Sequence, residues 1–165
     1  MKTKHPNHGF SLIEVMVAVL IVTLGLLGIA GTLLTATRSA SSSYLRQNAV
    51  QYAYDIVDRM RANAASVNAG GPYTASMAAP GTAPSPDCTT SSCTSAEMAA
   101  WDVWEWQSLL RNLPNGQGSI TLTSGPNSTT TITVTVQWID TPAQTTFNVA
   151  TSNLTPASYT VVTSL

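Results

Sequence analysis

The chain has 165 residues and a formal net charge of −1, and 44% of its residues are hydrophobic while only 9% are charged. This length suits one apolar segment and one modest globular domain, and a second full domain is not expected. The apolar residues gather near the N-terminus instead of spreading along the chain as they do in a soluble enzyme, so the chain consists of two unlike parts.

Residues 1–9 are polar and basic, whereas residues 10–37 contain a single ionisable side chain, Glu14. As a helix, residues 10–37 would be about 42 Å long, which exceeds the ~30 Å hydrocarbon core of a bilayer. Lys2 and Lys4 precede this segment, and the positive-inside rule therefore predicts a cytoplasmic N-terminus. Everything after about Thr37 would then lie across the membrane.

Three interpretations of this N-terminus compete: a secretory signal, a plain anchor and a prepilin leader. A secretory signal has an apolar stretch of about 7 to 15 residues, followed by small residues at the cleavage site, and the stretch here is about twice as long. A plain anchor explains the length but gives Glu14 no role. A carboxylate inside a membrane helix costs about 2.5–3.5 kcal/mol at the bilayer centre, so Glu14 calls for a partner.

The segment GFSLIEVMVAVLIVTLGLLGIAG, residues 9–31, resembles the N-terminal signature of type IV pilins and type II secretion pseudopilins. The resemblance implies that a prepilin peptidase removes residues 1–9 as a leader, cutting between Gly9 and Phe10. It also implies that Phe10 is then N-methylated, and that residues 10–37 form a transmembrane helix that becomes part of the fibre core. Glu14, by the same resemblance, pairs with the N-terminal amine of a neighbouring subunit during assembly.

Loss of the leader would leave a mature chain without Lys or His, which argues against an enzyme. Catalysis near neutral pH most often uses His as the base, and a nucleophilic Ser or Cys needs an activating base beside it. Cys88 and Cys93 have too few companions for a metal site, and no cofactor is expected. Two acidic pairs are expected to be solvated surface groups: Asp55 with Asp58, and Asp102 with Glu105.

Residues 38–64 are predicted to continue the helix in amphipathic form. Five apolar residues recur at steps of three and four: Leu45, Ala49, Tyr52, Ile56 and Met60. A helix from Ser11 to about Asn63 would be roughly 80 Å long, which suits the spine of a small domain.

Residues 65–117 are predicted to form a loop that contains a short helix at about 95–113. Residues 68–94 are rich in Gly, Pro, Ala, Ser and Thr and are taken as loop, and a periplasmic location predicts a disulfide between Cys88 and Cys93. Thr94 and Glu97 have the spacing of a capping box at the start of that helix.

Four tryptophans occur in the second part of the chain, and three of them fall on the predicted short helix. Trp106 shares an apolar stripe with Val103, Leu110 and Leu113, and this stripe is expected to face the sheet. Trp101 and Trp104 point away from it. Either a loop or the spine helix covers these two rings, or they contact another subunit or a surface ligand.

Residues 118–165 have a period of two with many intervening threonines, which predicts an antiparallel sheet of about four strands. The strands are expected around 120–122, 132–138, 147–149 and 159–161. A spine helix, a loop with a short helix and a meander make an α+β chain that resembles the pilin fold. WDVWEWQSLLRNLPNGQGSI and VTVQW are further similar to the PilV family of type IV pilus minor pilins.

The resemblance implies a minor pilin that primes or joins fibre assembly and so supports twitching motility and attachment. Its partners would be other minor pilins, the major pilin and prepilin peptidase, and its location the inner membrane before assembly and the extracellular fibre afterwards. A type II secretion pseudopilin, a surface-binding adhesin and a DNA-uptake pilin remain as alternatives. Between residues 65 and 165 the only basic residue is Arg111, so direct nucleic-acid binding is not expected.

Overall fold

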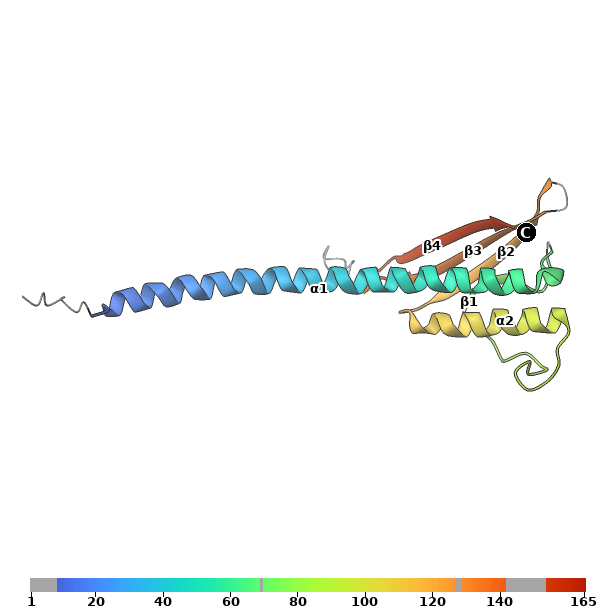
Figure 1. Cartoon of the computed structure of the whole chain (residues 1–165), viewed down its shortest axis with the longest axis horizontal. Helices are drawn as coiled ribbons and strands as arrows, with labels where there is room; N and C mark the ends of the chain where they lie inside the picture. The colour runs from blue at the N-terminus through green and yellow to red at the C-terminus, as the bar shows by residue number, and fades with distance from the viewer. Residues whose placement is uncertain (1–8, 69, 127–128, 142–153) are drawn as a thin grey trace, which may run out of the picture.

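A computed structural model describes residues 9–68, 70–126, 129–141 and 154–165 of the chain. One long helix carries a small head at its C-terminal half (Figure 1). The helices are α1 (Leu12–Ala62) and α2 (Ser95–Leu109), each followed by a short 3-10 turn, η1 (Ala64–Ser66) and η2 (Leu110–Asn112). The strands are β1 (Ala75–Ala78), β2 (Gln117–Ser124), β3 (Thr130–Ile139) and β4 (Pro156–Ser164).

Helix α1 is continuous over 51 residues, or about 76 Å, and passes without a break through Gly25, Gly28 and Gly31. Its two halves lie in different surroundings. Side chains of the N-terminal half are exposed among the described residues, whereas the C-terminal half is partly buried in the head. The buried side chains form one stripe along that half: Ala49, Ala53, Ile56, Val57 and Met60.

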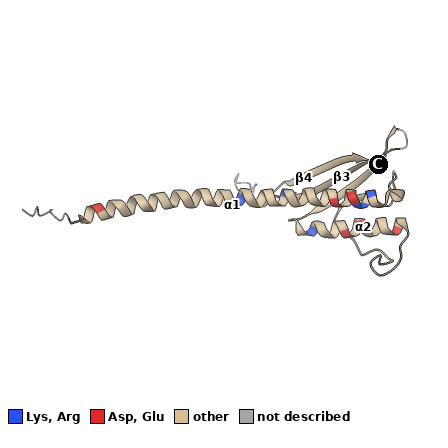
Figure 2. Ribbon diagram, in the orientation of Figure 1, with Lys and Arg blue, Asp and Glu red and all other residues tan. Residues whose placement is uncertain are grey.

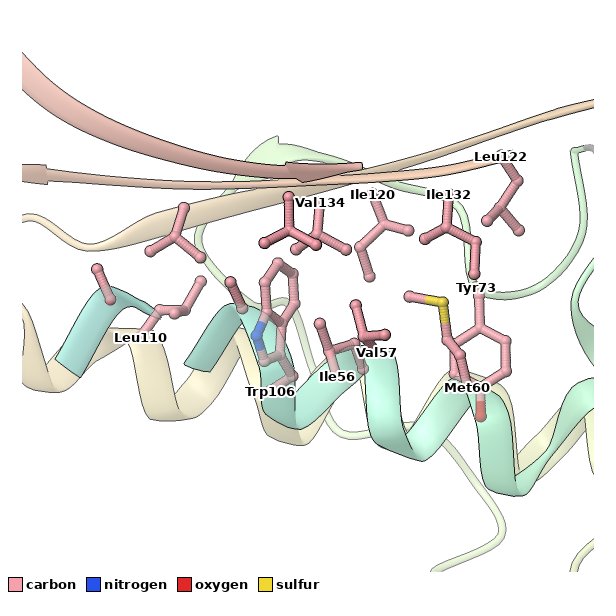
Figure 3. Packing of buried hydrophobic residues seen from close by; sticks show 14 of the residues in the cluster. Ile56, Val57, Met60, Tyr73, Trp106, Leu110, Ile120, Leu122, Ile132 and Val134 are labelled. Atoms are coloured by element: carbon pink, nitrogen blue, oxygen red, sulfur yellow. The ribbon is translucent and has the colours of Figure 1, made fainter. Parts of the chain in front are cut away.

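The core lies between a four-stranded antiparallel sheet, in the order β1-β2-β3-β4, and a layer made of α1 and α2. Figure 3 shows Ile120, Ile132 and Val134 of the sheet directed toward Ile56 and Trp106 of the helices. Every second residue of β2 and β3 contributes to this buried face, because alternate residues of a strand point to opposite sides of a sheet. The sequence pattern therefore predicts the buried face of these two strands correctly.

Trp106 is one of the two tryptophans in this core, and it contacts α1, α2 and the sheet. Its indole Nε1 donates to the carbonyl oxygen of Tyr52 on α1, at 2.8 Å. On the sheet side its ring lies so close to Gly118 that a Cβ at that position would come within 2.4 Å of a ring carbon. Gly118 is thus required for the close approach of β2 to α2.

The predicted α+β fold is confirmed: a long helix packs on a small antiparallel sheet, with a short second helix. The interpretation of residues 68–94 as loop throughout is wrong, because β1 lies within that stretch and pairs with β2 at the edge of the sheet. Its sequence, ASMA, has neither alternation nor β-branched residues, and only the exposed edge of β2 makes it a strand. The strand expected at 147–149 lies outside the described residues.

Helix α2 begins with the predicted capping box. The Thr94 hydroxyl accepts from the backbone N–H of Glu97, whose carboxylate accepts in return from the Thr94 backbone N–H at 2.7 Å. Just before it, Cys88 and Cys93 form the predicted disulfide. The chain reverses direction here, so that α2 runs antiparallel beside the C-terminal half of α1 (Figure 1).

An ion-pair cluster joins α1 to α2. Arg59 of α1 contacts Asp55 at 3.0 Å, Asp102 at 3.4 Å and Glu105, and the last two lie on α2. Asp102 also accepts a hydrogen bond from the Tyr73 hydroxyl at 2.7 Å, and burial together with this bond raises the pKa of Tyr73. Asp102 is only 8% exposed, so its assignment to the solvated surface is wrong. Its position one turn before the buried Trp106 explains why.

Replacing Arg59 by Ala is expected to lower the free energy of unfolding of the head by about 2–4 kcal/mol, because it leaves the buried Asp102 carboxylate without its cation. Arg61→Ala is the matched control, since Arg61 pairs with Asp58 on the exposed face and its loss should change the free energy by under about 0.5 kcal/mol. Urea unfolding followed by tryptophan fluorescence measures the head alone, because all four tryptophans lie there. Equal effects of the two substitutions would contradict this role for Arg59.

The capping box predicts a stability that depends on pH. The backbone and hydroxyl hydrogen bonds from Thr94 lower the pKa of Glu97, so its contribution is complete above the ordinary pKa of a glutamate and is lost as pH falls through the lowered value. The Glu97→Ala variant should therefore be less stable than the wild type at neutral pH, and the difference in stability between the two proteins should become smaller at acidic pH. Urea midpoints at neutral and acidic pH measure this, and a gap independent of pH would contradict it.

Candidate functional site

The N-terminal half of α1 presents an uncovered apolar surface. Phe10 is 85% exposed and Leu27 70%, and every residue from Gly9 to Ser41 is exposed. Four threonine hydroxyls on this half donate to backbone carbonyls of the preceding turn, namely those of Thr23, Thr32, Thr35 and Thr37. These polar groups are therefore satisfied within the helix, and the surface suits a medium without water.

By length and composition, α1 is the one helix among the described residues that is able to cross a membrane. In Figure 2 this half is drawn almost entirely in the tan of uncharged residues, with red near its start and blue where it approaches the head. A monomer in water would expose far more contiguous apolar surface than soluble proteins tolerate. The surface therefore requires lipid or other apolar helices around it.

Glu14 lies in the first turn of α1, two residues after the helix begins at Leu12. Its backbone N–H donates to the Ser11 carbonyl at 3.1 Å, and Ser11 is the N-cap residue but makes no side-chain cap. The first-turn N–H groups and the positive end of the helix dipole favour an anion at this position. Gly9 and Phe10 precede the helix and are exposed, while the rest of the predicted leader, residues 1–8, lies outside the described residues.

Trp101 and Trp104 are brought together on the outer side of α2, with ring centroids 5.1 Å apart and ring planes 51° from parallel. The indole Nε1 of Trp104 donates to the carbonyl oxygen of Gly81 at 3.1 Å, so the loop before α2 lies against this ring. Both rings are partly buried. The loop thus accounts for part of their burial and leaves part of each ring accessible.

No group of three or more His, Cys, Asp or Glu side chains able to hold a metal ion occurs in the part of the chain that the structure describes. The Arg59 cluster is a constellation that the sequence reasoning missed. The position of Asp102 on the same helical face as Ala99 and Trp106, both buried, is the signal that identifies it. Its role is structural, because each of its charged groups is paired within the head.

Two family models match the chain. The model described as the prokaryotic N-terminal methylation motif matches residues 4–30, which include Gly9, Phe10 and Glu14. The Tt1218-like model, described as type IV pilin Tt1218, matches residues 33–104, from the end of the apolar half of α1 to the first two-thirds of α2. The chain is a type IV pilin-like protein. Comparisons with curated proteins and with solved structures give no significant match.

As a type IV pilin-like protein, the chain is a structural subunit of the kind that prepilin peptidase processes and that assembles with other pilins. The methylation motif and the long apolar helix fit a pilin anchored in the inner membrane before assembly. Neither model extends over the sheet strands β2 to β4, so the resemblance resides in the helix, the loop and α2.

Proposed function

We propose that this pilin-like chain is a minor subunit of a type IV pilus, and that it primes or joins the fibre and so supports twitching motility and attachment. After a cut between Gly9 and Phe10, and N-methylation of Phe10, the apolar half of α1 would pass from the inner membrane into the core of the fibre. The observation that carries the proposal is the continuous helix α1, which is uncovered along its apolar half and carries a head on the other.

Glu14 is proposed to pair with the N-terminal amine of a neighbouring subunit. The carboxylate is exposed, lies in the first turn and is uncompensated by any positive side chain on the apolar half. Transfer of such a carboxylate into an apolar fibre is unfavourable unless a cation meets it. The amine of a processed neighbour is a cation at the same end of an identical or similar helix.

The alternatives differ in what the head should carry. A DNA-uptake pilin needs clustered basic side chains, but the single basic residue after residue 65, Arg111, is directed to the carbonyl oxygen of Pro80 at 3.4 Å. An adhesin, or a contact with another subunit, would use the accessible parts of Trp101 and Trp104. A type II secretion pseudopilin would have the same kind of N-terminal helix, so the helix does not distinguish the two systems. The similarity of the head sequence to the PilV family of minor pilins favours the pilus.

Deletion of the gene tests pilus against secretion. We expect fewer surface pili and reduced twitching, with normal export of type II secretion substrates. Complementation with the wild-type gene should restore the pili and the twitching. Normal piliation combined with lost secretion would assign the chain to the secretion system instead.

Glu14→Gln tests the pairing role, and Glu14→Asp is the matched control that keeps the charge. Both variants should be cut before Phe10, as read by mass spectrometry of the mature N-terminus with its added methyl group. The Gln variant should fall at least about tenfold in sheared pili, since the loss of ~1.4 kcal/mol already has that effect. A different mature N-terminus would refute the processing, and undiminished recruitment of the Gln variant would refute the pairing.

A further inference from the structure

The neck of the molecule, defined as residues 38–46 between the apolar half of α1 and the head, has a basic character that no ion pair within the described residues explains. Arg38 and Arg46 are exposed, and neither has an ion pair among the described residues. Along α1 no acidic residue occurs between Glu14 and Asp55. Asp140 is the acidic group that approaches the neck from the described part of the head, and it accepts a hydrogen bond from Ser42.

The position of Arg38 along the helix matches the boundary of a bilayer. If Glu14 marks the edge at which α1 enters the hydrocarbon, about 20 residues span the core, and the core ends near Leu34. Arg38 then lies about 6 Å further on, within the headgroup layer, whereas Arg46 lies about 18 Å beyond the core. Long arginine side chains on a helix are directed back toward its N-terminus, which here is toward the lipid.

The chemistry of the neck suits phosphate. Guanidinium groups bind phosphate oxygens through paired N–H donors, and the exposed serines 39, 41 and 43 lie between the two arginines. In the mature chain Lys2 and Lys4 are gone, and the amine of Phe10 is balanced by Glu14. The neck, with two arginines against the single carboxylate of Asp140, would then carry the net positive charge beside the apolar segment.

We propose that the neck binds the phosphate groups of anionic phospholipids in the leaflet beneath the head, with Arg38 in the headgroup layer and Arg46 acting across the adjacent water. This rests on the proposed membrane-anchored state of the processed subunit. The contact would fix the depth of the helix before assembly. It would be reversible, because one or two arginines are attracted only weakly to a charged surface, and the attraction declines within a Debye length of about 8–10 Å.

The test uses the full mature protein in nanodiscs that mix phosphatidylglycerol with phosphatidylcholine, and native mass spectrometry counts the lipids released with it. The wild type should retain phosphatidylglycerol in excess of its share. Arg38→Gln should lower that enrichment about fivefold, Arg46→Gln should lower it less, and higher salt should lower it for the wild type. Arg61→Gln, an exposed arginine of the head, is the matched control and should leave the enrichment unchanged.

An enrichment that Arg38→Gln leaves unchanged, or that Arg61→Gln lowers equally, would overturn the proposal. The proposal would also be overturned if the Arg38→Gln variant retained the lipid enrichment but was reduced in sheared pili, because the neck would then contact a neighbouring subunit. The mature N-terminus and the membrane fraction are measured in parallel. A correctly cut, membrane-bound wild type without lipid preference would defeat the neck proposal alone, whereas an uncut or soluble chain would defeat the proposed function.

Discussion

A single continuous helix whose two halves need different surroundings is the constraint on which the rest of the structure depends. Backbone hydrogen bonds run unbroken through α1, so the two halves cannot fold back on each other to bury the apolar residues of the first half. The head covers only the C-terminal half, and the apolar surface of the other half remains for lipid or for neighbouring helices. The apolar residues of the first half can therefore be buried only by contact with lipid or with other subunits.

The head is held to α1 by two kinds of contact that act at different points along the helix. Nearer the neck, Trp106 fills the space between α1, α2 and the sheet and bonds to the α1 backbone. Further along, Arg59 and Asp102 join the two helices by charge inside a partly buried cluster. Packing supplies most of the stabilisation, while the charged cluster is costly to break because Asp102 has little access to water.

The three parts of the molecule differ in charge, and each part therefore suits a different kind of partner. The apolar half carries one carboxylate near its start, the neck carries two arginines without ion pairs in the described structure, and the head beyond residue 65 carries one arginine among several acidic groups. The scarcity of basic residues in the head argues against nucleic-acid binding, and the two arginines next to the apolar helix are the basis of the proposed lipid contact. Contacts with other pilins are proposed for the apolar half of the helix, and the partly accessible tryptophan pair is a candidate for such a contact.

The sequence by itself determined the apolar helix, the methylation motif around Gly9 and Phe10, the disulfide, the capping box and the period-two strands, because each depends on neighbours a few residues apart. Only the tertiary structure decided the rest. The stretch ASMA became β1 because the edge of β2 offered hydrogen bonds to it, and Asp102 was buried because Arg59 and Tyr73 met it across two helices and the loop between them. Such partners are dozens of residues away in the chain. The helical face that Asp102 shares with Ala99 and Trp106 indicates its burial, but no local pattern indicates which residues it pairs with.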